Sequence, residues 1–351
     1  MRFSINNTCK PPQFSTVIFI LTFVVWMSSS ACEKTGTKKE ITQEITSQNV
    51  LSSWNDTPTK NAIIKFVSKT TDSTNQSFIP IADRIACFDN DGTLWAEQPI
   101  YFQLAFAIDR IKALAPSHPE WKNQEPYKSI LEGNISNVLA GGEHALLEII
   151  MATHANISTD SFSLVVKNWI DTASNPATGK HYKDMIYLPM LELLNYLRAN
   201  NFKTFIVSGG GVDFMRVFAE TLYGIPPYQV IGSSGKTQYI IKDDVPTIQK
   251  LPELNFIDDG AGKPIGIYQY IGKRPVFASG NSDGDYQMLQ WTSAGDKPNM
   301  CLLVHHTDSI REFAYDRNSA IGKLNKGLDD AEKYNWIIVD IQKDWKQVFK
   351  N

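Results

Sequence analysis

The sequence predicts an α/β protein in which helices cover a parallel β-sheet and a long helical segment is inserted after the first strand. Three observations lead to this prediction. From Ile81 onward, short apolar runs alternate with glycine-rich turns and amphipathic helices, the order typical of parallel sheets. Three of these runs end in loops that combine glycine with Asp, Ser or Asn. More than a hundred residues with helical patterning separate the first two runs.

Five apolar runs predict the strands of the sheet: Ile85–Phe88, Thr204–Val207, Val276–Ala278, Cys301–Val304 and Trp336–Val339. Because the ligand crevice of such a sheet lies at the carboxyl ends of its strands, we expect the loops that follow to converge on one site. Two of the runs contain Cys87 and Cys301, and we expect both to be small buried thiols.

Helical periodicity fills the segment between the first two predicted strands. One face is formed by Leu104, Ile108, Ile111 and Ala115, and a second by Phe162, Val165, Val166, Trp169 and Ile170. Thr159 is the expected N-cap of the second helix. We expect aromatic residues of this insert, such as Trp121 and Trp169, to be core residues rather than a ligand cage.

Later segments continue the alternation of helices and strands. A helix is predicted over Met190–Arg198, opened by Pro189 and ended by Asn200-Asn201. Another helix, ending at Gly224, is indicated by Phe214, Val217, Phe218 and Leu222. Tyr228–Leu251 has β-branched residues interrupted by turn residues, which predicts a hairpin.

The composition is that of an ordinary globular protein. The 351 residues are 42% hydrophobic and include 34 Lys and Arg, 37 Asp and Glu, and 4 Cys. A formal charge of −3 gives no electrostatic footprint for a phosphate backbone, so we expect no nucleic-acid partner. The low cysteine count excludes a disulfide scaffold. The length favours one large domain or one domain with an insert.

The first 31 residues have the pattern of a secretory signal peptide. Arg2 and Lys10 precede the uncharged apolar run Phe14–Met27, which small residues connect to Cys32. This run is too short to span a bilayer, which takes about 20 residues. We therefore expect an exported protein, with an uncleaved anchor as the alternative.

Ser-Ala-Cys32 resembles the lipobox of bacterial lipoproteins, although Ser29 stands where that pattern prefers Leu. The resemblance implies a lipid on Cys32 and a protein at the periplasmic face of a bacterial membrane, attached only through this anchor. Without the lipid, the protein would be periplasmic or secreted. Removal of residues 1–31 takes away two cations and no anions, which changes the formal charge from −3 to −5.

Two carboxylates, Asp89 and Asp91, follow directly after the first predicted strand, and Gly92 allows a sharp turn behind them. In an extended segment, residues two positions apart point to the same side. Such a pair can bind a hard cation or divide the nucleophile and proton-transfer roles between them. For this segment alone, a turn with solvated acids is an equally good interpretation.

The segment Phe88–Trp95 (FDNDGTLW) resembles the first motif of the haloacid dehalogenase superfamily, in its phosphatase branch. Three further motifs of that superfamily follow in order. Ser208 with Gly209 matches the second, Lys263 the third, and residues 280–285 (GNSDGD) the fourth. The match covers roughly residues 81–304.

The resemblance implies a Rossmann-like core with a helical cap after the first strand, as in the phosphoserine-phosphatase-like branch. The expected organisation is a signal peptide at 1–31, a tether at 32–52, an α/β core formed by 53–97 and 186–351, and a helical cap at 98–185. The polar composition of the segment around residues 33–60 agrees with a tether and a lead-in helix.

The resemblance also implies the role of each matched residue. Asp89 would form an aspartyl-phosphate, and Asp91 would act as general acid and then as general base. Ser208, Gly209 and Lys263 would bind the phosphoryl group. Glu97 lies where related phosphatases place a substrate-facing acid, although an exposed turn residue is an equal alternative.

Mg2+ is the implied cofactor, held by the Asp89 carboxylate, the Asp91 main-chain carbonyl and the fourth motif. That motif departs from the family pattern because Asn281 replaces an Asp. The metal ligands in it are therefore open among Asn281, Asp283 and Asp285.

Three positions outside the four motifs have a lesser claim to a site role. Lys236 is a competitor of Lys263 for the cationic role, although its surroundings predict a hairpin. One residue of the pair His305-His306 could border the crevice, and Arg317 could meet a substrate anion. For the two histidines a structural role is the better expectation, and for Arg317 a surface ion pair.

The sequence thus predicts a Mg2+-dependent hydrolase of a small phosphomonoester. Alternatives are a phosphotransferase or mutase on the same scaffold and an inactive surface binding lipoprotein. Asn281 is the feature that favours the inactive form. Asp91 favours phosphate chemistry over dehalogenation, because only a phosphatase has an alkoxide to protonate.

Overall fold

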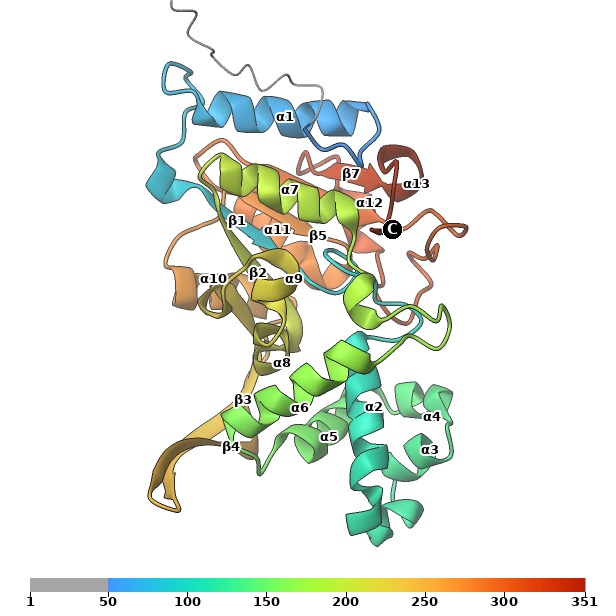
Figure 1. Ribbon diagram of the computed structural model, residues 1–351. Helices are drawn as coiled ribbons and strands as arrows, with labels where there is room; N and C mark the ends of the chain where they lie inside the picture. The colour runs from blue at the N-terminus through green and yellow to red at the C-terminus, as the bar shows by residue number, and fades with distance from the viewer. Residues whose placement is uncertain (1–49, 351) are drawn as a thin grey trace, which may run out of the picture. The chain divides into compact units, whose positions relative to one another are not determined.

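Seven strands form one sheet in the order β4-β3-β2-β1-β5-β6-β7 (Figure 1). The computed structural model describes residues 50–350, with backbone only for 142–147. The strands are β1 Ile85–Phe88, β2 Lys203–Gly211, β3 Val230–Lys242, β4 Val245–Phe256, β5 Phe277–Gly280, β6 Met300–His305 and β7 Ile337–Asp340. Neighbouring strands are parallel except for the antiparallel pair β3 and β4. The predicted signal peptide, Cys32 and most of the predicted tether lie outside the described residues.

The five predicted strands are confirmed, as is the α/β class. Every residue of β1 and β5 is buried, because helices cover both faces of the sheet. On one face, Ala86 and Phe88 belong to the same hydrophobic cluster as residues of helices α1 (Pro58–Thr71) and α7 (Leu188–Ala199). On the other face, Ile85 and Cys87 pack with α10 (Gly262–Ile271) and α11 (Tyr286–Ser293). Cys87 and Cys301 are free, buried thiols, as expected.

The helices inserted between β1 and β2 are α2 Phe102–Leu114, α3 Tyr127–Leu131, α4 Ile135–Ala140, α5 Gly142–His154 and α6 Thr159–Thr172. Leu104, Ile108 and Ile111 of α2 are buried in a separate cluster with Trp121 and Ile149. The first predicted face and the core role of Trp121 are thus confirmed, although Ala115 lies just beyond the end of α2. On the second predicted face, Phe162, Val166 and Ile170 of α6 are buried in the main hydrophobic cluster, while Val165 and Trp169 are partly buried against it. The N-cap prediction was one residue late, because the Ser158 side chain accepts the hydrogen bond from the Ser161 amide.

The helix predicted through residues 214–222 is in fact two short helices, α8 Val212–Arg216 and α9 Ala219–Tyr223. Because the helix is interrupted, two aromatic rings of this segment pack against different neighbours. Phe214 lies against Phe106 of the insert, with ring centroids 5.3 Å apart, and Phe218 stacks on Trp95 at 4.8 Å. The predicted end of this segment is confirmed, since Gly224 has a φ of +69° at the C-cap of α9.

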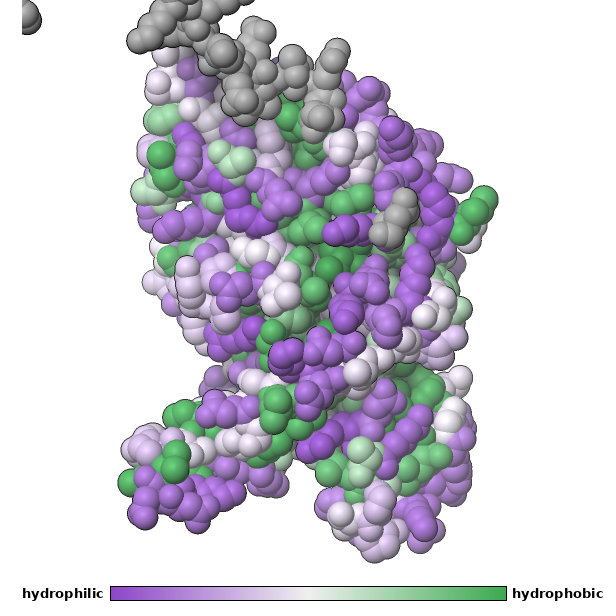
Figure 2. All heavy atoms as spheres, in the orientation of Figure 1, coloured by the Kyte–Doolittle hydropathy of each residue, from purple (hydrophilic) through white to green (hydrophobic). Residues whose placement is uncertain are grey.

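The predicted hairpin is confirmed and extends to Phe256, through β3 and β4. Its turn contains Asp243 and Asp244, both with positive φ, as a tight two-residue hairpin requires. Figure 2 shows apolar and polar residues side by side on this hairpin, and Tyr239 and Ile241 are among its exposed side chains.

The remaining helices are short segments of the C-terminal region, α12 Lys326–Asp330 and α13 Ile341–Asp344. In the described part of the chain, no helix has the length and apolar character that crossing a membrane requires.

Candidate active site

The three central strands bring polar residues from distant parts of the sequence to one edge of the sheet. Asp89 follows β1, Ser208 lies near the end of β2, and Asn281 follows β5. Because β1 pairs in parallel with both β2 and β5, their carboxyl ends lie together. The strand-end loops therefore converge, and Gly209 lies beside Ser208 at the same edge.

Lys263 lies beneath this edge, at the second position of α10, with only 1% of its surface exposed. Its Nζ atom donates to Asp89 Oδ1 at 2.6 Å, to Asp285 Oδ1 at 2.5 Å and to the Val207 carbonyl at 2.9 Å. Burial disfavours the ammonium, but the carboxylates of Asp285 and Asp89 outweigh it and raise the pKa of Lys263. The side chain is thus a permanent cation joined to the carboxylate after β1.

Lys236, the alternative cation, has no part in this cluster. Its Nζ lies 2.6 Å from Glu253 on the neighbouring strand of the hairpin, and both side chains are about half exposed. The pair is an ordinary surface ion pair, which contributes little to stability.

Asp89 and Asp91 differ in their surroundings. Burial and then the Asp285 carboxylate raise the pKa of Asp89 well above its usual range, while Lys263 acts in the opposite direction. Asp91 Oδ1 accepts a hydrogen bond from Trp95 Nε1 at 2.8 Å, and burial raises the pKa of Asp91 as well. The two carboxylates thus differ in their partners, because Asp89 is bonded to a cation and Asp91 to a neutral indole N–H.

Gly92 closes the loop behind the two aspartates with a φ of +76°. A Cβ atom at this position would lie 2.0 Å from Asn281 Nδ2 and 2.5 Å from Glu97 Oε1. The conformation and the close approach both require glycine.

The polar residues of the fourth motif have partners in two different places, the cluster at the strand ends and a neighbouring loop. The side-chain oxygen Oδ1 of Asn281 accepts a hydrogen bond from Thr93 Oγ1 at 3.1 Å, and the main-chain N–H of Asn281 donates to Asp285 Oδ2 at 2.9 Å. The Asp283 carboxylate instead accepts hydrogen bonds from the main-chain amides of residues 325, 326 and 327. Asn281 and Asp285 thus lie with Asp89, whereas Asp283 points to a different loop.

Glu97 is not an exposed turn residue, because only 1% of its surface is accessible. Its Oε1 atom accepts from Asn281 Nδ2 and from the Tyr315 hydroxyl, each at 2.7 Å. Burial raises the pKa of Glu97 well above its usual range. The side chain lines the same cavity as Asp89 and Asp91.

His306 supports the first motif from behind. Its Nε2 atom donates to the Gly92 carbonyl at 2.8 Å, and its ring stacks on Tyr315 with centroids 4.3 Å apart. His305, in contrast, meets Asp316 at 3.3 Å near the surface. Arg317 forms an exposed ion pair with Asp329, as expected for a surface residue.

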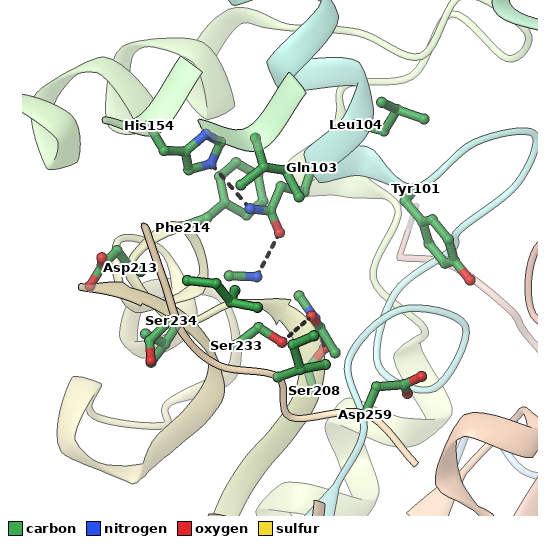
Figure 3. A pocket seen from close by; sticks show the side chains of 18 of the residues that line it. Tyr101, Gln103, Leu104, His154, Ser208, Asp213, Phe214, Ser233, Ser234 and Asp259 are labelled. Atoms are coloured by element: carbon green, nitrogen blue, oxygen red, sulfur yellow. Dashed lines mark hydrogen bonds between the residues drawn. The ribbon is translucent and has the colours of Figure 1, made fainter. Parts of the chain in front are cut away.

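A cavity of about 380 Å³ opens above the cluster, between the strand ends and the inserted helices (Figure 3). Its lining includes Asp89, Asp91, Ser208 and Lys263 at one end and residues of α2, α5 and β4 at the other. Both the core and the insert therefore shape the space next to Asp89.

Gln103 connects these two parts and was missed by the sequence analysis. Its Oε1 accepts from the Gly211 amide at 2.7 Å, and its Nε2 donates to His154 Nε2 at 3.1 Å (Figure 3). Burial and then the Lys250 charge lower the pKa of His154 to about 3, so its ring is neutral and can accept this bond. The only signal in the sequence is one amide within the apolar run FQLAFAI.

The residues at the strand ends fit a hard divalent cation. The described residues contain no group of three or more His, Cys, Asp and Glu side chains arranged as a ready-made metal site. The carboxylates of Asp89, Glu97 and Asp285 are buried and that of Asp91 is partly buried. Lys263 forms ion pairs with two of them, Asp89 and Asp285. Such an excess of negative oxygen donors, joined by the Asn281 amide, is the chemistry that Mg2+ prefers.

Comparison with known proteins gives structural neighbours only. No protein-family model and no curated protein matches the sequence. A protein of unknown function from Bordetella pertussis is 13% identical over 74% of this chain and 99% of that one, with a TM-score of 0.47. An uncharacterised protein from Anaerococcus prevotii is 16% identical over 80% and 91%, with a TM-score of 0.45. A phosphoserine phosphohydrolase-like protein from Francisella tularensis is 14% identical over 72% and 98%, with a TM-score of 0.35.

Proposed function

We propose that the chain is a Mg2+-dependent phosphomonoester hydrolase of the haloacid dehalogenase superfamily, in its phosphoserine-phosphatase-like branch. One observation carries the proposal: the Asp89 carboxylate lies at the end of β1, bonded to the buried Lys263, on the floor of a cavity that Asp91 and Ser208 also line. The proposed nucleophile, proton carrier and phosphoryl-binding groups thus line one cavity.

Asp89 is the nucleophile in this mechanism. Lys263 holds its Oδ1 at 2.6 Å, while Oδ2 receives a longer hydrogen bond of 3.4 Å from the Thr93 hydroxyl. Oδ2 attacks phosphorus and forms a P–O bond as the ester P–O bond breaks. The electron pair of the broken bond leaves with the alcohol oxygen, and Asp89 becomes an aspartyl-phosphate.

Asp91 moves the proton. Its raised pKa favours the protonated form, which gives its proton to the leaving alkoxide. The resulting carboxylate then takes a proton from the water that attacks phosphorus of the aspartyl-phosphate. This second displacement releases inorganic phosphate and restores the Asp89 carboxylate. Trp95 Nε1 fixes Asp91 Oδ1, so the side chain keeps one orientation for both transfers.

Ser208 and Gly209 bind the phosphoryl oxygens. Lys263 stabilises the phosphoryl charge through its own positive charge, because its three N–H donors already go to Asp89, Asp285 and the Val207 carbonyl. Ser208 Oγ accepts from the Gly210 amide at 3.1 Å, which leaves its O–H free to donate. Mg2+, held by the Asp89 carboxylate, the Asp91 main-chain carbonyl and the Asn281 amide oxygen, would screen the repulsion between the anionic nucleophile and the phosphoryl group. Asp285 is already bonded to Lys263 and to main-chain amides, so its role is to position Lys263.

The cellular location stays a prediction from residues 1–32. We propose export and attachment through a lipid on Cys32, which would put the hydrolase at the periplasmic face of a bacterial membrane.

The experiment is a phosphate-release assay of the full chain on a phosphomonoester panel, with and without Mg2+, beside Asp89→Asn. We expect turnover that needs Mg2+ and falls at least about a thousandfold in the variant, since removal of a nucleophile has effects of this size or larger. Asp329→Asn, in a surface ion pair, is the control that should keep its activity. Turnover that survives Asp89→Asn would contradict the mechanism, and an inactive wild type would favour a binding protein.

A further inference from the structure

We infer that the ester hydrolysed at this site has a neutral, largely apolar alcohol as its leaving group. The inference rests on the proposed function and concerns the end of the cavity that lies away from Asp89. Phosphoryl chemistry occupies one end of the space, so the other end must receive the alcohol part of the ester.

Aliphatic side chains form two walls at this far end. Leu104 of α2 with Ile150 and Met151 of α5 makes one wall, and Leu251 and Leu254 of β4 with the following Ile257 make the other. All but Leu104 are at least partly exposed. Apolar side chains that face an open cavity from both sides are the pattern of a binding site for an apolar group.

Two polar side chains of the cavity lining, Gln103 and Ser233, already have partners inside the protein. Gln103 is bonded to the Gly211 amide and to His154, and the Ser233 hydroxyl donates to the Gly209 carbonyl at 2.8 Å. Figure 3 shows the Gln103 bonds as dashed lines across the cavity wall. A leaving group rich in hydroxyls would lose water here without gaining matching hydrogen bonds, which is unfavourable.

The charges at this end are also balanced. Lys250 is 5% exposed and forms an ion pair with Asp213. Among the described residues that line the cavity there is no arginine, and the other lysine is Lys263 at the phosphoryl end. A carboxylate on the leaving group, as in phosphoserine, would find no unpaired cation among these lining residues. A neutral alcohol avoids this problem.

The test compares esters that differ only in the alcohol, using the full chain with Mg2+. Butyl, hexyl and octyl phosphate vary the apolar length, glucose 6-phosphate matches hexyl phosphate in carbon number but carries hydroxyls, and phosphoserine carries charge. We expect kcat/KM to rise from butyl to hexyl phosphate by about fourfold per methylene. Hexyl phosphate should exceed glucose 6-phosphate and phosphoserine at least about tenfold.

Each outcome decides the inference. A flat alkyl series, or preference for glucose 6-phosphate or phosphoserine, would overturn it while the proposed hydrolase stands. Absence of Mg2+-dependent turnover with every ester would overturn the proposed function, and the inference with it.

A pair of variants on one hairpin locates the effect. Leu254→Asn adds a polar group to the cavity wall, and we expect the hexyl-to-glucose preference to fall about tenfold. Ile241→Asn lies on the same hairpin but is 67% exposed and outside the cavity lining, so the preference should persist. An unchanged preference in Leu254→Asn would contradict the assignment of this wall. Should that variant fail to fold, the alkyl series on the wild type still decides the question.

Discussion

The two ends of the cavity each contain a buried lysine, and the two lysines are used differently. Lys263 lies between Asp89 and Asp285, with Glu97 and Asp91 close by, so carboxylates outnumber the cation. Lys250 pairs with Asp213 alone, and its Nζ lies 4.9 Å from the centre of the Phe162 ring. One end therefore has an excess of negative charge, while the other is balanced.

Under the proposed function, the excess of negative charge marks the end of the cavity at which Mg2+ and the phosphoryl group bind. A buried carboxylate without a counter-charge lowers the stability of the fold unless it binds a cation or a proton. The cluster at the strand ends is therefore suited to bind a further cation. At the end that contains Lys250, the charges are already paired, and the cavity wall is lined with aliphatic side chains instead. Substitutions at each end of the cavity can test this difference in charge and function.

The largest effect should come from Lys263→Met. The substitution leaves Asp89 and Asp285 without their cation, so we expect kcat to fall at least about a hundredfold and the free energy of unfolding to fall by about 3 to 5 kcal/mol. Phosphate release and urea denaturation measure the two effects. Lys250→Met is the matched control, because it removes a buried paired lysine at the other end. Lys250→Met should lower stability while kcat changes less than about tenfold. Equal losses of kcat in the two variants would contradict the assignment of different roles to the two lysines.

A second prediction concerns Asp258, which is fully buried near Lys263. Burial raises its pKa from 3.8 to about 7, with Lys263 opposing the rise. Because the folded-state pKa is the higher one, the unprotonated side chain disfavours folding: the cost begins as the pH rises above about 4, grows by about 1.4 kcal/mol per pH unit and levels off above about 7.

Asp258→Asn removes this cost. The variant should gain stability over the wild type as the pH is raised from 5 to 8, as measured by urea denaturation at each pH. A difference between variant and wild type that does not change with pH would show that Asp258 adds nothing to the charge excess of this end.

The smallest effect is expected for Gln103→Leu, which acts where the insert meets the core. The variant leaves the Gly211 amide without its partner and should lower stability by about 1 to 2 kcal/mol. Because Gly211 continues the strand end that begins at Ser208, we expect kcat/KM to fall several-fold, about fivefold. Gln290→Leu loses a single hydrogen bond to Tyr334, and neither residue lines the cavity, so kcat/KM should stay unchanged. Equal kcat/KM for both variants would mean that Gln103 does not position this loop.

Local pattern was sufficient to predict the strand-end residues. Asp89 and Ser208 could be found because each ends an apolar run, and parallel strands bring such ends together. Lys263 could be found from its place in the third motif. The five strands could likewise be predicted from continuous apolar runs, and the hairpin from β-branched residues interrupted by turn residues.

Contacts between distant segments could not be predicted in this way. Gln103 and Gly211 are 108 positions apart, and nothing near either residue indicates the other. Asp283 and Asp285 are equivalent in the sequence, yet a short turn directs Asp283 to residues 325–327 and Asp285 to Lys263. Glu97 is buried because Tyr315 and Asn281 cover it, and both lie far along the chain.

Trapping of the phosphorylated intermediate tests whether Asp89 is the residue that carries the phosphoryl group. The full chain is mixed with Mg2+ and a phosphomonoester that it hydrolyses, quenched in acid during turnover, digested and analysed by mass spectrometry. The account predicts a phosphoryl group on the peptide that contains Asp89, and none on that peptide in Asp89→Asn. A phosphoryl group on another residue, or rapid turnover with no phosphorylated peptide at any quench time, would contradict it.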